Sequence, residues 1–201
     1  AKVVADTLLR TGFQIVACAV ETSTVDAFFA DIPLISDDDV LAASAEHDAR
    51  LVNGIGGVGN TSPRKDLFER FKAAGAEFQT IRHPSAVVAD DARIGEGVQI
   101  MAGAVVQPGV MLGANTIINT RASVDHDCDV GAHVHIAPGV TLSGNVSVGD
   151  GTHLGTACCA IQGVTIGSGS VVGGGALITE DLPAGGRYVG SPARSVGDKS
   201  T

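Results

Sequence analysis

Tryptophan is absent from this 201-residue sequence, tyrosine occurs once and phenylalanine six times, so large aromatic side chains contribute little to its core. Hydrophobic residues nevertheless make up 44% of the chain, enough to bury a substantial core. The 27 glycines tolerate the positive φ angles that sharp corners often need. The composition therefore indicates tight coils with small interior residues, and the length suits two domains better than one.

Basic residues are also few. The formal net charge of -9 and the pI near 4.9 leave no basic face for the phosphates of a nucleic acid, and a membrane surface is equally disfavoured. The sequence has no apolar run long enough to span a bilayer and no signal peptide at its start. We therefore expect a cytoplasmic protein.

A hexad repeat runs through the second half of the chain. Aliphatic residues recur at every sixth position from Val88 to Ile178, and Ala160 is the one small member of the series. A second uncharged series lies four places after each of these residues, as at Val98 and Ala104. A short fixed period marks a solenoid, in which each repeat buries its apolar face by stacking on its neighbours.

Glycine adds a second, longer period that returns at every third hexad. Its members are Gly95, Gly113, Gly131, Gly149 and Gly167. A corner that returns every third hexad gives each coil three sides, so the section should be a triangular prism with apolar residues inside. The sequence thus predicts a parallel β-helix, and any active site must use its outside.

This stretch resembles the left-handed β-helix of the hexapeptide-repeat acyltransferases. The resemblance implies the left-handed sense, and the unbroken hexads predict roughly five coils over residues 88–178 without an external loop.

Cys128 and Cys158 fall in the second inward series, Cys159 follows them and Cys18 lies in an apolar run. No metal-type CxxC spacing occurs, so we expect four free thiols.

The first eighty residues alternate between helix and strand signals. In chain order these are VVADTLLR, QIVACAV, DDVLAASAEHD, RLVNGIG and RKDLFERFKAA. The pattern predicts a small α/β unit. Ser62 and Pro63 suit the N-cap and first turn of its third helix, and Gly75 suits the end of that helix.

Ligands of parallel α/β sheets sit outside the carboxyl ends of the strands. That rule points to Glu21 and Thr22, which follow QIVACAV, and to Gly59 in the loop GIGGVGNTSPR, as candidate substrate-binding residues. An ordinary glycine-rich turn is the alternative, since loose glycine spacings are weak motifs.

The order of a small α/β unit and then this β-helix resembles the family of sialic acid O-acetyltransferases and nucleotide-sugar N-acetyltransferases, which includes bacillosamine and perosamine acetyltransferases. The resemblance implies a Rossmann-like N-terminal domain that binds the nucleotide sugar. In the family a strand and a GGH-type glycine-rich turn precede the first helix, and AKVVADTLLR matches that helix. The chain therefore reads as an N-terminally truncated fragment or as an altered domain.

One hexad carries the strip Asp125-His126-Asp127-Cys128. Val124 and Cys128 should point inward, which places His126 on the outer surface. An imidazole there can take a proton from an attacking amine or hydroxyl, while a neighbouring carboxylate, Asp125 or Asp127, fixes its tautomer. The alternative is a solvated turn whose aspartates keep the prism soluble.

The family resemblance gives this strip a role. NHDC, DHDC or EHEC at this place carries the family's catalytic histidine, so the resemblance implies that His126 is the general base. It also implies that Asp127 raises the basicity of this histidine, and that His135 contacts acetyl-CoA.

His133 and His135 flank inward Val134 and should both point away from the prism. With His126 they suggest a second possibility, because zinc-dependent carbonic anhydrases of γ type, built on this same β-helix, bind metal with three histidines shared between subunits. The spacing fits the acetyltransferases better, and no metal is expected.

Gly144 lies three hexads beyond His126, in the same place one coil further on. Its N–H is a candidate oxyanion donor, an effect typically worth on the order of a hundredfold in rate, and a tight corner is the alternative explanation. Thr156 and Gly174 match family positions that line the acetyl-CoA groove. Arg194, in YVGSPAR, replaces a lysine of the family's closing VGVPAK segment and suits a CoA phosphate.

Together these observations predict a small α/β domain at residues 1–84, a β-helix at 85–183 and a C-terminal segment at 184–201. The expected function is transfer of an acetyl group from acetyl-CoA to an amino or hydroxyl group of a nucleotide-linked sugar or sialic acid. The cofactor should lie between neighbouring prisms of a homotrimer. The alternatives are a non-catalytic sugar-nucleotide-binding or scaffold protein and the zinc hydratase.

Overall fold

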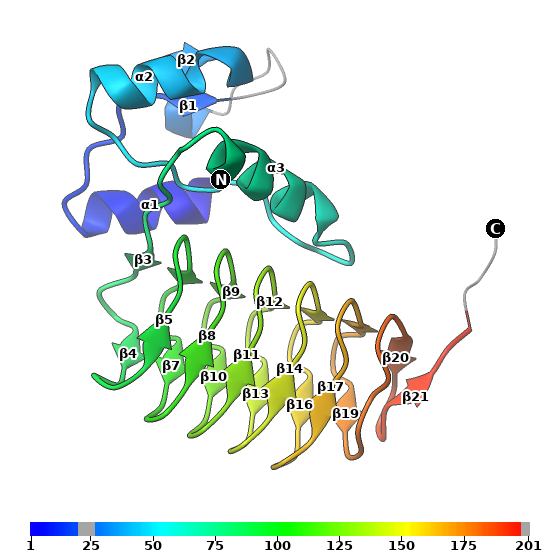
Figure 1. Cartoon of the computed structure of the whole chain (residues 1–201). Helices are drawn as coiled ribbons and strands as arrows, with labels where there is room; N and C mark the ends of the chain where they lie inside the picture. The colour runs from blue at the N-terminus through cyan, green and yellow to red at the C-terminus, as the bar shows by residue number, and fades with distance from the viewer. Residues whose placement is uncertain (20–26, 198–201) are drawn as a thin grey trace.

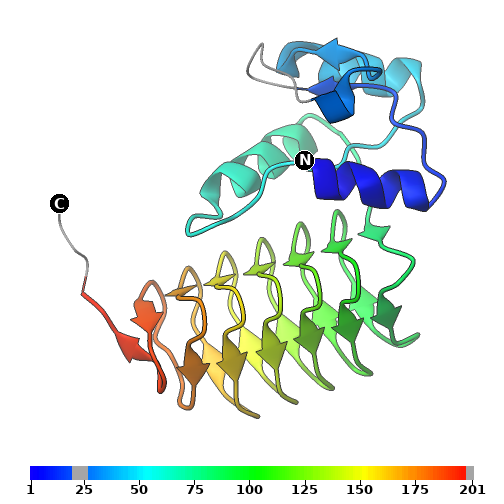
Figure 2. The same cartoon turned by 180° about the vertical axis from the view of Figure 1, so that it is seen from behind.

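The structure, a computed structural model, describes residues 1–19 and 27–197. Its main body is a three-sided prism of stacked coils, and a small N-terminal unit lies over one side of it (Figure 1). The view from behind shows the same arrangement, with the N-terminal helices along the tops of the coils (Figure 2).

The N-terminal unit contains three α-helices and two short 3-10 helices in its described part. Its elements are α1 (Lys2–Arg10), β1 (Cys18–Ala19), η1 (Ala27–Phe29), β2 (Leu34–Ile35), η2 (Asp37–Asp39), α2 (Val40–Glu46) and α3 (Ser62–Ala73). The strands β1 and β2 pair in parallel, and Leu51 forms an isolated parallel bridge with Phe78. The three predicted helices are confirmed, whereas the segment predicted as a strand at 50–56 contributes only this bridge.

The start of α3 differs by one residue from the prediction. Thr61 is the N-cap, Ser62 is the first helical residue and Pro63 lies in the first turn. Gly75, with φ +89°, follows the helix as predicted, because a left-handed residue ends the helical hydrogen-bonding pattern.

Side 1 of the prism carries eight strands. They are β3 (Ile81–Arg82), β6 (Gln99–Ile100), β9 (Ile117–Ile118), β12 (His135–Ile136), β15 (His153–Leu154), β18 (Val171–Val172), β20 (Arg187–Val189) and β21 (Arg194–Ser195). All neighbours on this side are parallel except β21, which returns antiparallel to β20.

On sides 2 and 3, all pairs of neighbouring strands in the described residues are parallel. Side 2 contains β4 (Val87–Val88), β7 (Val105–Val106), β10 (Ser123–Val124), β13 (Thr141–Leu142), β16 (Cys159–Ala160) and β19 (Leu177–Ile178). Side 3 contains β5 (Arg93–Ile94), β8 (Met111–Leu112), β11 (Asp129–Val130), β14 (Ser147–Val148) and β17 (Thr165–Ile166). Each strand pairs with the strand three hexads away, as Val124 does with Leu142, so the predicted three-hexad coil is confirmed.

The interior of the prism is filled by the two predicted inward series. Ile118, Val124, Ile136 and Leu142 are completely buried, and so is Cys158 of the second series. Burial of one such aliphatic side chain contributes about 1.5–3 kcal/mol. All four cysteines are free thiols, as predicted.

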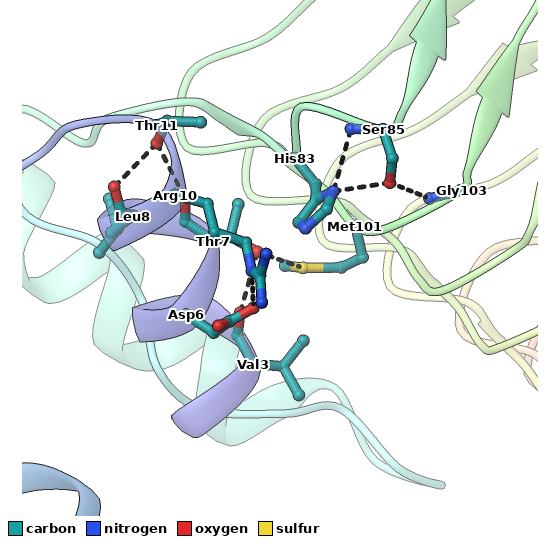
Figure 3. Close-up of polar contacts among 10 residues, drawn as sticks. All are labelled: Val3, Asp6, Thr7, Leu8, Arg10, Thr11, His83, Ser85, Met101 and Gly103. Atoms are coloured by element: carbon teal, nitrogen blue, oxygen red, sulfur yellow. Dashed lines mark hydrogen bonds and ion pairs between the residues drawn. The ribbon is translucent and has the colours of Figure 1, made fainter.

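Two of the contacts between the N-terminal unit and the prism involve the helices α1 and α3. On α1, Thr7 Oγ1 lies 3.8 Å from Met101 Sδ, and Leu8 packs with Met101 and Ile81 (Figure 3). The neighbouring turn of the first coil is closed by Ser85 Oγ, 2.7 Å from His83 Nδ1.

The second contact is made by α3 through Arg64, whose side chain is 1% exposed. Its guanidinium donates to the carbonyl oxygens of Asn53, Ile55 and Asn115. This network joins the helix, the loop before it and the edge between sides 3 and 1. The N-terminal unit therefore covers side 1, and leaves the edge between sides 2 and 3 on the opposite part of the prism. No helix in the described ranges is long and apolar enough to cross a membrane.

Two valines of side 2 test this architecture. Val106→Ala should lower the free energy of unfolding by about 1.5–3 kcal/mol, because Val106 is 1% exposed inside the prism. The matched control is Val87→Ala on the same side, whose side chain points outward and is 63% exposed. Chemical denaturation of both variants measures the difference, and equal losses would contradict the assignment of inward and outward positions.

Candidate active site

The strip Asp125-His126-Asp127 forms the corner between β10 on side 2 and β11 on side 3. Val124 and Cys128, at its two ends, are buried inside the prism. The His126 side chain leaves the prism and is 62% exposed. The prediction that this histidine lies on the outer surface is therefore confirmed.

The structure shows which aspartate pairs with the imidazole. Asp127 Oδ2 lies 2.9 Å from His126 Nδ1, whereas Asp125 Oδ1 accepts the backbone N–H of His126 at 2.7 Å. A carboxylate beside Nδ1 favours the tautomer that carries its proton there, which leaves Nε2 with a free lone pair.

The charges at this corner also set the affinity of His126 for a proton. The hydrogen bond that Nδ1 donates to Asp127 raises the pKa of His126 above its ordinary value, and the negative charges of Asp125 and Asp127 act in the same direction. The imidazole is thus oriented at Nδ1 by a carboxylate, and its side chain is largely exposed to solvent.

Gly144 stacks directly on the ring. Asn145 N–H donates to the His126 carbonyl at 2.8 Å, which sets the two coils in register. A Cβ on residue 144 would lie 2.5 Å from His126 Nε2 and 2.6 Å from Cε1, so only glycine leaves room for the ring in this position. Gly144 is buried beneath the ring, and its N–H has no acceptor among the described residues. The corner thus combines an oriented imidazole with an unpaired backbone donor.

His135 and His133 leave the prism as predicted, but the N-terminal unit covers them both. His135 is 4% exposed, its Nε2 lies 3.2 Å from Asn119 Nδ2, and a Cβ on Gly57 would lie 3.3 Å from its Nδ1. Burial lowers the pKa of His135 to about 4, so the ring is neutral at neutral pH. Within one chain the structure does not bring His135 to the edge that carries His126.

Thr156 and Gly174 stack on one another at the corner between sides 1 and 2. Both are exposed, and a Cβ on Gly174 would lie 3.1 Å from the Thr156 carbonyl oxygen. Side 2 therefore has His126 on one of its edges and this pair on the other.

Arg194 begins β21 near the C-terminal end of the prism. Its guanidinium donates to Glu180 Oε1 at 2.9 Å, and both side chains are more than half exposed. An exposed pair of this kind contributes about 0–1 kcal/mol, so an anionic ligand competes easily for this cation.

The structure gives no support for ligand binding by the three predicted substrate-binding residues. Glu21 and Thr22 lie outside the described residues. Gly59 has φ +69° in the loop before α3, and a Cβ there would meet open space, so its backbone conformation accounts for the glycine.

Three histidines do not form a metal site within the chain. His126 lies on the edge opposite side 1, whereas His133 and His135 face the N-terminal unit. In the described ranges no group of three or more His, Cys, Asp or Glu residues could hold a metal ion.

Asn119 and Arg64 contribute contacts that the sequence pattern does not predict. The Asn119 side chain contacts His135, and Arg64 holds the loop above it. Asn119 follows β9 and His135 belongs to β12, which are neighbouring strands of side 1, so their contact depends on side-chain rotation that periodicity does not fix. The Arg64 contact depends on how the N-terminal unit docks.

The pairing of Asp127 with His126 is open to direct measurement. Asp127→Asn should lower the pKa of His126 towards the ordinary value of about 6.5, because the negative charge beside Nδ1 is lost. An NMR titration of the imidazole measures this pKa. Asp125→Asn, which removes only a charge beside the backbone N–H, should lower it less. A larger shift in the Asp125 variant would contradict the pairing.

Comparisons with known proteins place this geometry in a family. Residues 91–122 match the model of the bacterial transferase hexapeptide (six repeats). A 45-residue segment is 53% identical to the UDP-N-acetylbacillosamine N-acetyltransferase of Bacillus subtilis (strain 168), and spans 22% of this chain and 21% of that protein.

Two solved structures match almost the whole chain. One is a variant of perosamine N-acetyltransferase from Caulobacter crescentus in complex with CoA and GDP-perosamine, with 36% identity over 98% of this chain and 92% of that one and a TM-score of 0.90. The other is the acetyltransferase domain of PglB from Neisseria gonorrhoeae in complex with acetyl coenzyme A, with 35% identity over 97% and 93% of the two chains and a TM-score of 0.89. The chain belongs to the family of hexapeptide-repeat sugar N-acetyltransferases that these proteins represent.

Proposed function

We propose that this chain transfers the acetyl group of acetyl-CoA to the amino group of a nucleotide-linked sugar, with His126 as the general base. The observation that carries the proposal is the corner at β10–β11, where Nδ1 of an exposed imidazole is held by Asp127 and Nε2 faces Gly144. Family membership supplies the reaction class, and the corner supplies a group that performs it.

The proposed step is a direct attack without an acyl-enzyme. The acceptor nitrogen forms a bond to the thioester carbonyl carbon while His126 Nε2 takes its proton, and Asp127 stabilises the imidazolium that results. The carbonyl oxygen becomes an oxyanion, to which the unpaired N–H of Gly144 donates. Collapse of this intermediate breaks the carbon–sulfur bond, and the proton on His126 passes to the departing CoA sulfur.

We assign acetyl-CoA to side 2 and its edges. Thr156 and Gly174 line the far edge of that side, and Arg194 offers a cation to a CoA phosphate. The outward residues of side 2 between the two edges are small or apolar, including Ser123 and Thr141, and leave room for a pantetheine arm. His135 joins this set only if another copy of the chain brings it there.

The position of His126 favours an assembly of several copies. The N-terminal unit, the proposed holder of the nucleotide sugar, covers side 1 of its own prism (Figure 1). His126 lies at the corner between β10 and β11, on the edge opposite that side. A sugar held by one copy therefore reaches His126 of a neighbouring copy, and we propose the homotrimer of the family, with CoA between neighbouring prisms.

The finer description of the fold is part of this proposal. We assign a left-handed sense to the β-helix, a Rossmann-like character to the N-terminal unit, and domain limits at residues 1–84, 85–183 and 184–201. A cytoplasmic location accords with a nucleotide-linked acceptor.

Each alternative predicts a different result. A non-catalytic binding or scaffold protein binds the nucleotide sugar without releasing CoA from acetyl-CoA. A zinc hydratase contains stoichiometric metal and loses its activity to a chelator. O-acetylation of a hydroxyl group, on a sugar or on sialic acid, uses the same base and thioester and is distinguished only by the acceptor.

The proposal is tested by release of free CoA thiol from acetyl-CoA with UDP-, GDP- and CMP-linked amino sugars and free sialic acids. Release with one acceptor is expected, and His126→Ala should reduce kcat by about a hundredfold or more because the general base is lost. His47→Ala, at an exposed histidine at the end of α2, is the matched control and should keep the wild-type rate. A His126→Ala variant with near wild-type kcat would refute the assignment.

The assembly has its own test. Light scattering coupled to size-exclusion chromatography should give three times the 20.2 kDa mass of the chain. Full activity in a form that sedimentation shows to be a monomer would contradict the proposed sharing of the site between copies.

A further inference from the structure

We propose that Gly109 is a positioning residue for the base: the space left by its missing side chain holds the Asp127 carboxylate against His126. The catalytic meaning of this inference rests on the proposed acetyl transfer. Its structural content concerns the His126–Asp127 pair alone.

Gly109 lies one coil before Asp127 on the same edge of the prism. A Cβ on residue 109 would lie 2.5 Å from Asp127 Oδ1, closer than Cβ atoms approach oxygen in real structures. The other carboxylate oxygen, Oδ2, is the one that contacts His126 Nδ1 at 2.9 Å. The carboxylate is thus bounded by Gly109 on one side and by the imidazole on the other.

The backbone around Gly109 cannot easily move to make room. Its N–H donates to Asp91 Oδ2, one coil earlier, at 3.0 Å. Asp127 N–H donates to the Pro108 carbonyl at 3.1 Å, so the two corners are tied together. A side chain at 109 would therefore be relieved by rotation of the Asp127 side chain, which is 68% exposed and free to turn into solvent. That rotation breaks the contact with Nδ1.

Backbone conformation alone does not explain the glycine. Gly109 has φ +74°, but Asp127 and Asn145 adopt φ +58° and +59° at the equivalent positions of the next two coils. Gly163, a further coil along the same edge, has φ +76°, and a Cβ there would meet nothing within 4 Å. Gly109 and Gly163 share the same strained corner, and only Gly109 has a carboxylate in the space beside it.

This difference supplies matched variants. Gly109→Ala and Gly109→Asn fill the space, and the asparagine variant guards against a folding defect because asparagine already holds this conformation at Asn145. Gly163→Ala and Gly163→Asn introduce the same backbone strain without a neighbour. NMR titration of the His126 imidazole, in the full chain, is the primary measurement, and the pH dependence of kcat for CoA release is the second.

Both Gly109 variants should lower the pKa of His126 in the direction that Asp127→Ala does, and should move the acidic limb of the kcat profile to lower pH. Both Gly163 variants should keep the wild-type pKa. In a chain that already carries Asp127→Ala, Gly109→Ala should cause no further shift, because the group it displaces is gone.

An unchanged pKa of His126 in Gly109→Asn, or a further shift on top of Asp127→Ala, would overturn the inference. The proposed function can fail independently of this inference. If the wild-type protein releases no CoA with any acceptor, Gly109 has no role in acetyl transfer, but the titrations still decide whether it positions Asp127 against His126.

Discussion

The constraint on which the structure depends is the stacking of coils at a constant spacing of three hexads. No coil buries its own apolar residues, and each is completed by the coils before and after it. The completely buried column that includes Ile118, Ile136 and Leu154 on side 1 is the result. Because the register cannot slip without exposing this column, every outward side chain is also fixed relative to its neighbours one coil away.

The candidate site is a direct product of that register. His126, Gly144 and Gly109 belong to different coils, yet they meet at one edge because equivalent positions recur at every third hexad. The corner needs little beyond the fold: one imidazole, one carboxylate, and two glycines that leave space for them. Its exposure to solvent gives access to substrates, and the raised pKa of His126 comes from a neighbouring carboxylate rather than from burial.

Much of this was predictable from periodicity. The inward residues, the three sides of each coil and the outward position of His126 follow from counting by single hexads and by groups of three. The same counting leads from Asp127 to Gly109, although the importance of that glycine appears only when the direction of the carboxylate is known. Periodicity could not choose between Asp125 and Asp127, because both flank His126 and the choice depends on side-chain rotation.

The N-terminal unit was harder to predict. Its helices follow from local patterns, but the burial of Arg64 and the cover over His135 arise from docking between parts of the chain that share no repeat. The predicted strand at 50–56 also depends on partners from elsewhere in the chain, and in the described residues it forms one bridge, at Leu51. Local propensity therefore defined the parts of this unit but not their contacts.

The proposed reaction requires His126 Nε2 to accept the proton of the attacking group. The measurement that tests it most directly compares two pKa values in one buffer: that of the His126 imidazole by NMR titration, and that of the acidic limb of kcat/KM for acetyl transfer. If His126 is the base in the free enzyme, the two values agree and Asp127→Asn lowers both together. An acidic limb that stays in place while the pKa of His126 moves would contradict the account.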